Sequence, residues 1–535
     1  MIAAAANLAW FASQAGAARH FRWQLRDPAA TQARRLQELL QRHATSAFGR
    51  QHGFAGIRSA AEFAARVPLS TYEELEPWID RIRQGEAAVL TADAVTHLVP
   101  TSGSSRACKL IPFTAGLQRE FDAAIGPWIA DLYGRHPRAL LGPSYWSISP
   151  ALQDWSSTPS RVPIGFEDDT RYLGGLRRQL VAATLATPPA LRLAGDLESF
   201  MLATLVCLLR TRNLRLISVW HPSFLLLLLD ALPRHWTSVL EILHTGRWPA
   251  SLALPPALHS ALRLKAEPAC ARELERLGPD EPRGLWPHLA VISCWTDAHA
   301  ALGAAAVAKR FPGVALQSKG LLATEAFISL PFAGAHPLAI GSHYFEFIAA
   351  DGSLQAAHEL QLHEIYEVVV STGGGLWRYR LGDRVQVDGF VARTPSLRFV
   401  GRAGAVSDLF GEKLSEEFVT TVLQTLPDPA AEPARFAMLV PDSDGRSGGY
   451  TLYWEGAAPP AASALEARLL ANPHYAWCRQ LGQLRAAQVQ VVARDATAAY
   501  LRHRARGGAK LGDIKPPALA PAGEWVECFR GAPAG

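Results

Sequence analysis

Apolar residues at helical spacing predict that helices dominate the first hundred positions. The segment Thr31–His52 gathers its leucines on one face and its arginines elsewhere, which is typical of an amphipathic helix. Ser59–Glu62 and Ser70–Glu74 each place a glutamate three residues after a hydroxyl residue, the capping-box pattern that begins a helix. We therefore expect a helical amino-terminal region.

From residue 98 onward, short β-branched or aromatic runs alternate with longer helical stretches. This alternation favours an α/β domain whose sheets are covered by helices. Between His363 and Val400 the runs follow one another closely with glycine-rich turns, which indicates a local antiparallel or barrel-like sheet. The predicted strands are Leu214–Val219, Leu289–Cys294, Val314–Leu316, Phe345–Ile348, Glu367–Ser371, Arg384–Val387 and Leu397–Val400.

A domain boundary is expected near Gly401, because the pattern after it forms a compact α+β set. We therefore predict a large amino-terminal domain at 1–401 and a small carboxy-terminal domain at 402–535. The elements expected in the small domain are helices at Lys413–Leu426 and Ala461–Leu470 and strands at Phe436–Val440, Tyr450–Trp454 and Val489–Val492.

Apolar runs in the chain are too short to predict a membrane span. Ser199–Leu209 and Phe224–Leu229 each end at a charged residue, well before the roughly 20 residues that a span needs. The apolar first eighteen residues have no preceding Lys or Arg, so a packed opening helix is favoured over a secretory signal. No membrane association is expected.

Composition argues against several classes of partner. The chain has 53 Lys and Arg residues and 48 Asp and Glu residues, so its net charge is 53 − 48 = +5. This is a small positive excess for 535 residues, and no nucleic-acid partner is predicted. Six cysteines without a CxxC pair are too sparse for a disulfide scaffold. A reduced, cytoplasmic protein is the simplest interpretation, and a monomer is favoured.

The hydroxyl-rich segment that follows Leu98 and Val99 is the most informative candidate site. Its hydroxyls and backbone N–H groups are suited to phosphate oxygens, and a nearby lysine adds positive charge. Taken alone, such a cluster is more often an ordinary turn, and the usual GxxxxGK[ST] and GxGxxG motifs do not occur. The candidate residues are Thr101, Ser102, Gly103, Ser104, Ser105 and Lys109.

Two acidic clusters follow later in the chain. Thr324 and Glu325 place a hydroxyl beside a carboxylate, which is suited to Mg²⁺ held jointly with phosphates, although a solvated strand end is an equally good interpretation. Asp383 follows a glycine-rich turn and is suited to two ribose hydroxyls, although an Arg–Asp surface pair is the alternative.

The order of these clusters resembles the adenylate-forming enzymes, and more specifically the Gretchen Hagen family of auxin-responsive acyl-acid amido synthetases and its bacterial branch. The resemblance spans roughly residues 31 to 520. The stretches that carry it are RVPLSTYEEL (66–75), TSGSSRACKLIPFT (101–114), VPIGFEDDTRYLGG (162–175), LRLISVWHPSFLLLLL (214–229), LWPHLAVISCWTDA (285–298), QSKGLLATEAFISLP (317–331), GLWRYRLGDRVQVDGF (375–390), LRFVGRAGAVSDLFGEKLSEEFV (397–419), NPHYAWCRQLGQL (472–484) and GAKLGDIKPPAL (508–519).

The resemblance implies a β-barrel and helix-flanked sheets in the large domain, a mobile small domain, and ATP and a carboxylic acid bound between them. The implied activity joins the acid to AMP and passes the acyl group to an amino acid or another amine. A thiol acceptor such as coenzyme A, or a relative that has lost catalysis, remains the alternative. By motif, Thr101–Ser105 and Lys109 would hold the phosphates, Thr324 and Phe399 would lie at the nucleotide, Glu325 would bind Mg²⁺, Asp383 would bind the ribose, Arg402 would mark the hinge, and Lys413 and Lys515 would reach the α-phosphate.

The chain departs from the family pattern at three positions that are usually glycine. These are Arg106 in the hydroxyl-rich segment, Ala298 after Trp-Thr-Asp, and Ala326 after Thr-Glu. Glycine permits backbone angles and close approaches that other residues do not. The departures put the geometry of ATP binding in question but remove no charged group.

Overall fold

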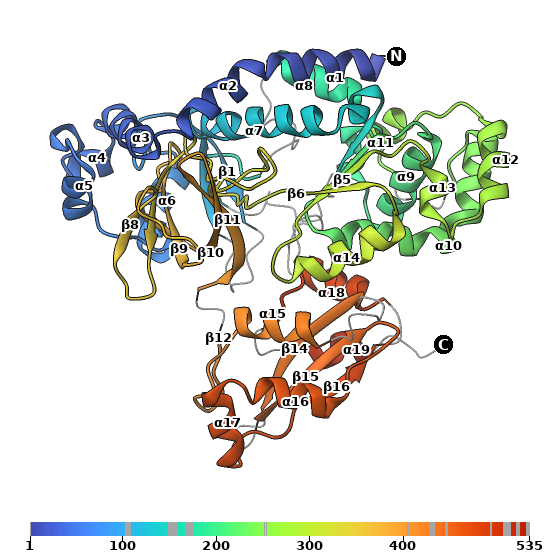
Figure 1. Ribbon diagram of the computed structural model, residues 1–535. Coiled ribbons are helices and arrows are strands. Elements are labelled where there is room, and N and C mark those ends of the chain that lie inside the picture. Colours follow the sequence, from blue (N-terminus) through green and yellow to red (C-terminus); the bar gives the residue numbers. More distant parts are fainter. Residues whose placement is uncertain are drawn as a thin grey trace. The chain divides into compact units, whose positions relative to one another are not determined.

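Two compact units make up the computed structural model, and Figure 1 labels their helices and strands. Unit 1 consists of Met1–Gly142, Asp154–Leu185 and Lys319–Val400. Unit 2 consists of Pro143–Gln153, Ala186–Ser318 and Gly401–Gly535. The predicted α/β fold is confirmed, whereas the boundary at 401/402 stays a prediction. The structure describes residues 2–101, 109–147, 159–165, 175–250, 252, 254–403, 406–426, 434–443, 448–492, 495–506, 515–520 and 525–530.

Helices form most of the start of unit 1, and their capping residues begin them. The Ser59 hydroxyl accepts the backbone N–H of Glu62 at 3.2 Å, as its position in the sequence predicts. The single helix predicted over 31–52 is wrong, because Ser46 caps a second helix by accepting the N–H of Gly49 at 2.9 Å. The helices of unit 1 are α1 (Ile2–Ser13), α2 (Ala15–Gln24), α3 (Pro28–His43), α4 (Ala47–Gln51), α5 (Ala60–Arg66), α6 (Tyr72–Arg83), α7 (Ala115–Arg135) and α8 (Gly175–Thr184).

Unit 1 also contains a five-stranded sheet and a separate antiparallel pair of strands. The pair is β1 (Val95–Pro100) and β2 (Leu110–Thr114), and the sheet consists of β7 (Tyr344–Ile348), β8 (Leu354–Ala356), β9 (Ile365–Ser371), β10 (Tyr379–Val391) and β11 (Thr394–Arg402). The sheet order is β11-β10-β9-β7-β8, and β9 pairs antiparallel with both neighbours, as predicted. Gln32 fixes α3 to this sheet: its amide donates to the carbonyls of Ile340 and His343 and accepts the N–H of Phe345.

A parallel four-stranded sheet lies in the core of unit 2. Its strands are, in order, β3 (Ser144–Trp146), β4 (Leu216–Ser218), β5 (Val291–Cys294) and β6 (Ala315–Ser318). Its helices are α9 (Leu197–Arg210), α10 (Pro222–Thr245), α11 (Pro256–Ala261), α12 (Pro268–Leu277), α13 (Pro282–Leu285) and α14 (Ala300–Arg310). The two apolar runs of the sequence belong to α9 and α10 and are buried in this core. Among the helices that the structure describes, none combines the length and apolarity that crossing a bilayer requires.

The last stretch of unit 2 is a smaller α+β arrangement, drawn in orange and red in Figure 1. Its elements are β12 (Val406–Ser407), β13 (Leu414–Ser415), α15 (Glu416–Thr425), β14 (Phe436–Ser443), β15 (Gly448–Glu455), α16 (Ala462–Leu469), α17 (Pro473–Gln480), β16 (Gln488–Val491), α18 (Ala496–Arg506) and α19 (Trp525–Arg530). β15 pairs antiparallel with β14 and parallel with β16. Trp454 of β15 and Leu465 of α16 are fully buried in a shared apolar core. This confirms the predicted α+β character of the small domain.

Candidate functional site

The ends of the hydroxyl-rich segment meet at the pair of strands β1 and β2. Thr101 directly follows β1 and donates its backbone N–H to the carbonyl of Lys109 at 2.9 Å, and Lys109 directly precedes β2. The β1–β2 ladder therefore sets where the segment begins and ends. The residues predicted to hold phosphates at Ser102, Gly103, Ser104 and Ser105, and the departure at Arg106, lie outside the described residues.

Two tyrosines surround the Lys109 ammonium. Its Nζ lies 5.5 Å from the ring centroid of Tyr72, within the range of a cation–π attraction, and 5.8 Å from that of Tyr379, on the hydroxyl side of the ring. The ammonium also donates a hydrogen bond to the Tyr379 hydroxyl at 3.3 Å. The Tyr72 hydroxyl accepts the N–H of Leu110 at 2.8 Å, so α6 holds the strand that carries the lysine. Lys109 is therefore a half-buried cation whose position is set by residues far from it in the sequence.

Asp383 lies on the strand that begins with Tyr379. The β9–β10 ladder shifts register between residues 380 and 384, and Gly382 takes φ +78°, an angle that favours glycine. This irregularity places Asp383 in a buried position, 3% exposed. Phe399 and Arg402 lie on the neighbouring strand β11, where Phe399 is half-buried and Arg402 is exposed. The structure thus groups Lys109, Asp383 and Phe399 on connected elements of unit 1.

Thr324 and Glu325 lie in a tight turn between β6 and β7. The turn is closed by a bridge between Leu322 and Phe327 and by a hydrogen bond from the N–H of Ala323 to the carbonyl of Ala326 at 3.0 Å. The Glu325 side chain is largely buried, at 9% exposed. A carboxylate in such a turn is suited to a hard cation that keeps phosphate oxygens or waters as its other ligands.

Lys413 ends a turn that two carboxylates hold together. Asp408 accepts the N–H of Gly411 at 2.7 Å, and the fully buried Glu412 accepts two further backbone N–H groups of the turn at 2.7 and 2.8 Å. Lys413 is exposed and takes φ +45°, a costly angle for a residue with a side chain. The helix predicted from Lys413 is therefore wrong at its start: α15 begins at Glu416.

Lys515 lies over an aromatic ring at the carboxyl edge of the parallel sheet. Its Nζ is 3.6 Å from the ring centroid of Trp295, which directly follows β5. Trp220, just beyond β4, packs against Trp295 with 5.5 Å between ring centroids. Burial lowers the pKa of the neighbouring His221 well below 6.5, and the charge of Lys515 adds to this effect, so the imidazole is neutral. Ligands of α/β sheets bind at this edge.

Family models match three successive parts of the chain. The GH3 family N-terminal domain matches residues 17–316, the GH3 family central domain matches 336–402, and the GH3 family C-terminal domain matches 416–524. The chain belongs to the GH3 family. All the described candidate residues except Thr324, Glu325 and Lys413 fall within these matched parts.

Curated GH3 relatives and solved structures extend along nearly the whole chain. The probable indole-3-acetic acid-amido synthetase GH3.12 of Oryza sativa subsp. japonica is 26% identical, over 94% of this chain and 93% of its own. The structure of AtGH3.15 acyl acid amido synthetase in complex with 2,4-DB superposes with a TM-score of 0.85 at 20% identity, covering 97% of this chain and 96% of that one. A 2-hydroxyisobutyryl-CoA ligase in the postadenylation state gives 0.53 at 15% identity, covering 95% and 92%. These structures confirm the GH3 and adenylate-forming fold.

The two described departures from the GH3 glycine pattern differ in their structural cost. Ala298 takes φ +47°, so its backbone keeps the left-handed conformation that glycine adopts freely, and the alanine is strained there. Ala326 has no positive φ and is fully buried, which a small side chain permits. Only position 298 therefore retains a backbone reason for glycine.

Sequence reasoning missed the tyrosines that surround Lys109 in this GH3 chain. Tyr72 lies in the stretch 66–75 and Tyr379 in the stretch 375–390, both quoted for the resemblance, but neither was singled out as a site residue. No spacing rule connects them to Lys109, because they belong to α6 and β10. Only the fold brings the three together.

The candidate residues have side chains of the kinds that phosphates and a divalent cation bind. Lys109, Lys413 and Lys515 are cationic and Glu325 and Asp383 are carboxylates, and their roles stay predictions. Within the described part of the chain, no three His, Cys, Asp or Glu side chains gather into a metal site of their own.

Proposed function

We propose that this protein is an ATP-dependent acyl-acid amido synthetase, which adenylates a carboxylic acid and transfers the acyl group to an amino acid or another amine. The observation that carries the proposal is the held cation Lys109, at the end of the hydroxyl-rich segment in a chain of the GH3 family. The relatives named amido synthetases support the reaction class. We do not assign the acid in their names, indole-3-acetic acid, to this protein.

In the first half-reaction, a carboxylate oxygen of the acid attacks the α-phosphorus of ATP. A bond forms between that oxygen and phosphorus, the bond to the β-phosphate oxygen breaks, and pyrophosphate leaves. Negative charge accumulates on the phosphoryl oxygens, and fixed cations stabilise it. We propose that Lys109 and Lys515 stabilise this negative charge and that Asp383 binds the ribose hydroxyls.

In the second half-reaction, the amine nitrogen attacks the acyl carbon and AMP leaves. The ammonium form of the acceptor first loses a proton to solvent, and the neutral amine then attacks. The nitrogen loses a second proton to solvent as AMP leaves, and the new amide bond replaces the acyl–phosphate bond. We assign Lys413 to the phosphate oxygens of the departing AMP, because its turn is held rigidly by Glu412 and Asp408. Glu325 would hold Mg²⁺, which would neutralise phosphate charge when bound.

The proposal is tested by acid-dependent exchange of labelled pyrophosphate into ATP across a panel of carboxylic acids. Exchange with at least one acid supports adenylation, and the absence of exchange with every acid contradicts it. Amines and coenzyme A are then added separately, and products are identified by mass spectrometry. A thioester without any amide would replace the amine acceptor with a thiol.

A further inference from the structure

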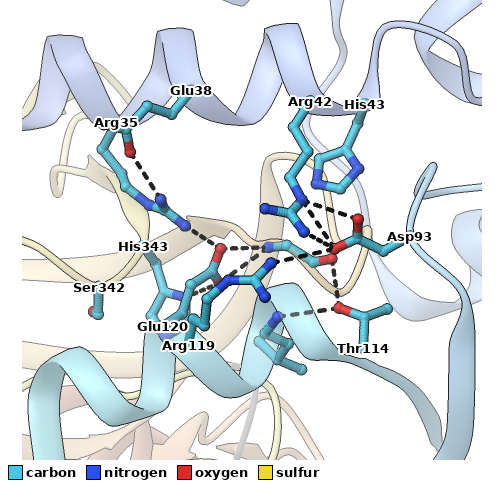
Figure 2. A network of polar contacts seen from close by, with 12 residues as sticks. Arg35, Glu38, Arg42, His43, Asp93, Thr114, Arg119, Glu120, Ser342 and His343 are labelled. Atoms are coloured by element: carbon cyan, nitrogen blue, oxygen red, sulfur yellow. Dashed lines mark hydrogen bonds and ion pairs between the residues drawn. The ribbon is translucent and has the colours of Figure 1, made fainter.

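A buried carboxylate in unit 1 has no role in the proposed chemistry but contacts several elements near Lys109. Glu120 of α7 is 2% exposed, and Figure 2 shows it at the centre of a network of polar contacts. His343 donates to its Oε2 from Nδ1 at 2.7 Å, and Arg35 of α3 forms an ion pair with its Oε1. A carboxylate on a long helix is ordinarily solvated, so its burial needs a reason.

The network fixes the protonation states of its members. His343 accepts the N–H of Phe327 at Nε2, at 3.0 Å, so the ring proton resides on Nδ1 and points at Glu120. Burial alone would raise the pKa of Glu120. The hydrogen bonds from His343 and from the Gly373 N–H, together with the charge of Arg35, oppose burial, and the pKa is lowered overall. Glu120 is therefore an ionised acceptor at neutral pH.

The backbone of Gly373 is the other partner of this carboxylate. Its N–H donates to both Glu120 oxygens, at 2.8 and 3.0 Å, and its carbonyl accepts from the hydroxyls of Thr114 at 2.9 Å and Thr91 at 3.3 Å. A Cβ at position 373 would stand 2.7 Å from a Glu120 oxygen, so only glycine fits. Both polar groups of this residue are thus held by side chains. We call this arrangement the Gly373 clamp.

The clamp joins the two chain segments that meet at Lys109. Thr114 ends β2, the strand that Lys109 directly precedes. Gly373 lies in the turn that leads into β10, with Tyr379 and Asp383. The two segments are therefore connected twice: by the contact between Lys109 and Tyr379, and by the Gly373 clamp a few residues away on each segment. A shift of either segment at the clamp would move the lysine relative to β10.

We infer that Glu120 is a positioning residue for ATP binding, acting through Gly373 on the placement of Lys109 and Asp383. The inference rests on the proposed function, because it takes Lys109 and Asp383 as nucleotide ligands. Misplacement of binding groups by about 1 Å is enough to change function by one to two orders of magnitude.

The test measures the Kd of ATP by calorimetry with Mg²⁺ present, together with the KM for ATP in pyrophosphate exchange. Glu120→Ala is expected to raise both at least ~tenfold, and Thr114→Val ~threefold, because it removes the bond to Gly373, together with the N-cap bond from Leu117, without changing charge. Thr114→Ser keeps the hydroxyl and should restore the parent values. Ile129→Val, at a buried site on the same helix, is the control for stability and should change neither.

An unchanged Kd and KM for ATP in Glu120→Ala, with only the active fraction reduced, would overturn the inference. If Glu120→Ala does not fold, the Thr114→Val and Thr114→Ser pair decides, and equal affinities for that pair overturn it. A parent protein that binds ATP but exchanges pyrophosphate with no acid contradicts the proposed function instead. In that case the Kd values still decide the role of the clamp.

Discussion

Replacement of Arg378 by methionine should destabilise unit 1 strongly. The Arg378 guanidinium is 3% exposed and forms two bonds of 2.9 Å to Glu346. It also donates to the carbonyls of Ala64 at 3.0 Å and Val67 at 2.7 Å, which tie α5 to the start of β10. Methionine fills a similar volume but satisfies none of these four acceptor contacts. The substitution therefore leaves the buried carboxylate of Glu346 without its positively charged partner.

The expected loss is about 3–5 kcal/mol of unfolding free energy, the usual cost of removing one partner of a buried ion pair. Arg380→Met, two residues along the chain, removes the partly exposed pair with Glu367 and should cost about 0–1 kcal/mol. The double variant Arg378→Met with Glu346→Leu should recover at least about 2 kcal/mol, because it removes the unpaired charge.

The deficit of Arg378→Met should also depend on pH. Burial already raises the pKa of Glu346 above its usual 4.5, with Arg378 opposing this effect, so removal of the arginine raises it further. A carboxyl group whose folded pKa is raised binds more protons in the folded state, so stability falls as pH rises from about 4.5 through the folded pKa. The deficit should therefore grow from pH 5 to pH 8.

Urea unfolding of the four proteins at pH 5 and pH 8 measures these differences, and the parent at each pH is the reference. Two outcomes would refute the reasoning. One is a double variant as unstable as Arg378→Met. The other is an Arg380→Met deficit equal to that of Arg378→Met.

Three further predictions concern the proposed chemistry and the backbone. Glu325→Gln should lower acid-dependent pyrophosphate exchange at least ~tenfold at limiting Mg²⁺, about 1.4 kcal/mol of barrier, and unchanged exchange would remove it from the metal site. Lys515→Ala should slow adenylation more than amide formation from a synthetic acyl-adenylate, and equal losses in both steps would contradict its assignment. Ala298→Gly should raise stability by up to about 1 kcal/mol by relieving φ +47°, whereas Ala305→Gly inside α14 should lower it by about as much; a destabilised Ala298→Gly would show that the strain is absent.

Sequence patterns located most strands because apolar runs suit buried sheets. Leu289–Cys294 and Glu367–Ser371 are predicted close to their observed bounds in β5 and β9. The pair β1 and β2 escaped detection, because β1 mixes Thr and His with apolar residues and β2 contains Pro112. Such strands are formed by pairing across the hydroxyl-rich segment rather than by their own apolar pattern.

The candidate site was predictable only in part. The order of the motifs indicates Lys109, Asp383 and Lys515 as candidate site residues, and the family resemblance implies their roles. The helix predicted from Lys413 failed because the Glu412 side chain closes a turn there, a contact that periodicity does not encode. Glu120 escaped notice because a glutamate on a long helix is usually solvated. Its partners Arg35 and His343 are remote in sequence.

The contact between Gln32 and the start of β7 has a consequence for the making of this protein. Gln32 binds main-chain atoms of Ile340 and His343, 308 and 311 residues later in the chain. At a synthesis rate of roughly 5–20 residues per second, α3 waits about 15–60 s for the segment that holds it. During that interval the Gln32 amide, buried in the finished protein, lacks these main-chain partners. α3 should therefore reach its final position on the sheet only after this late segment has been made.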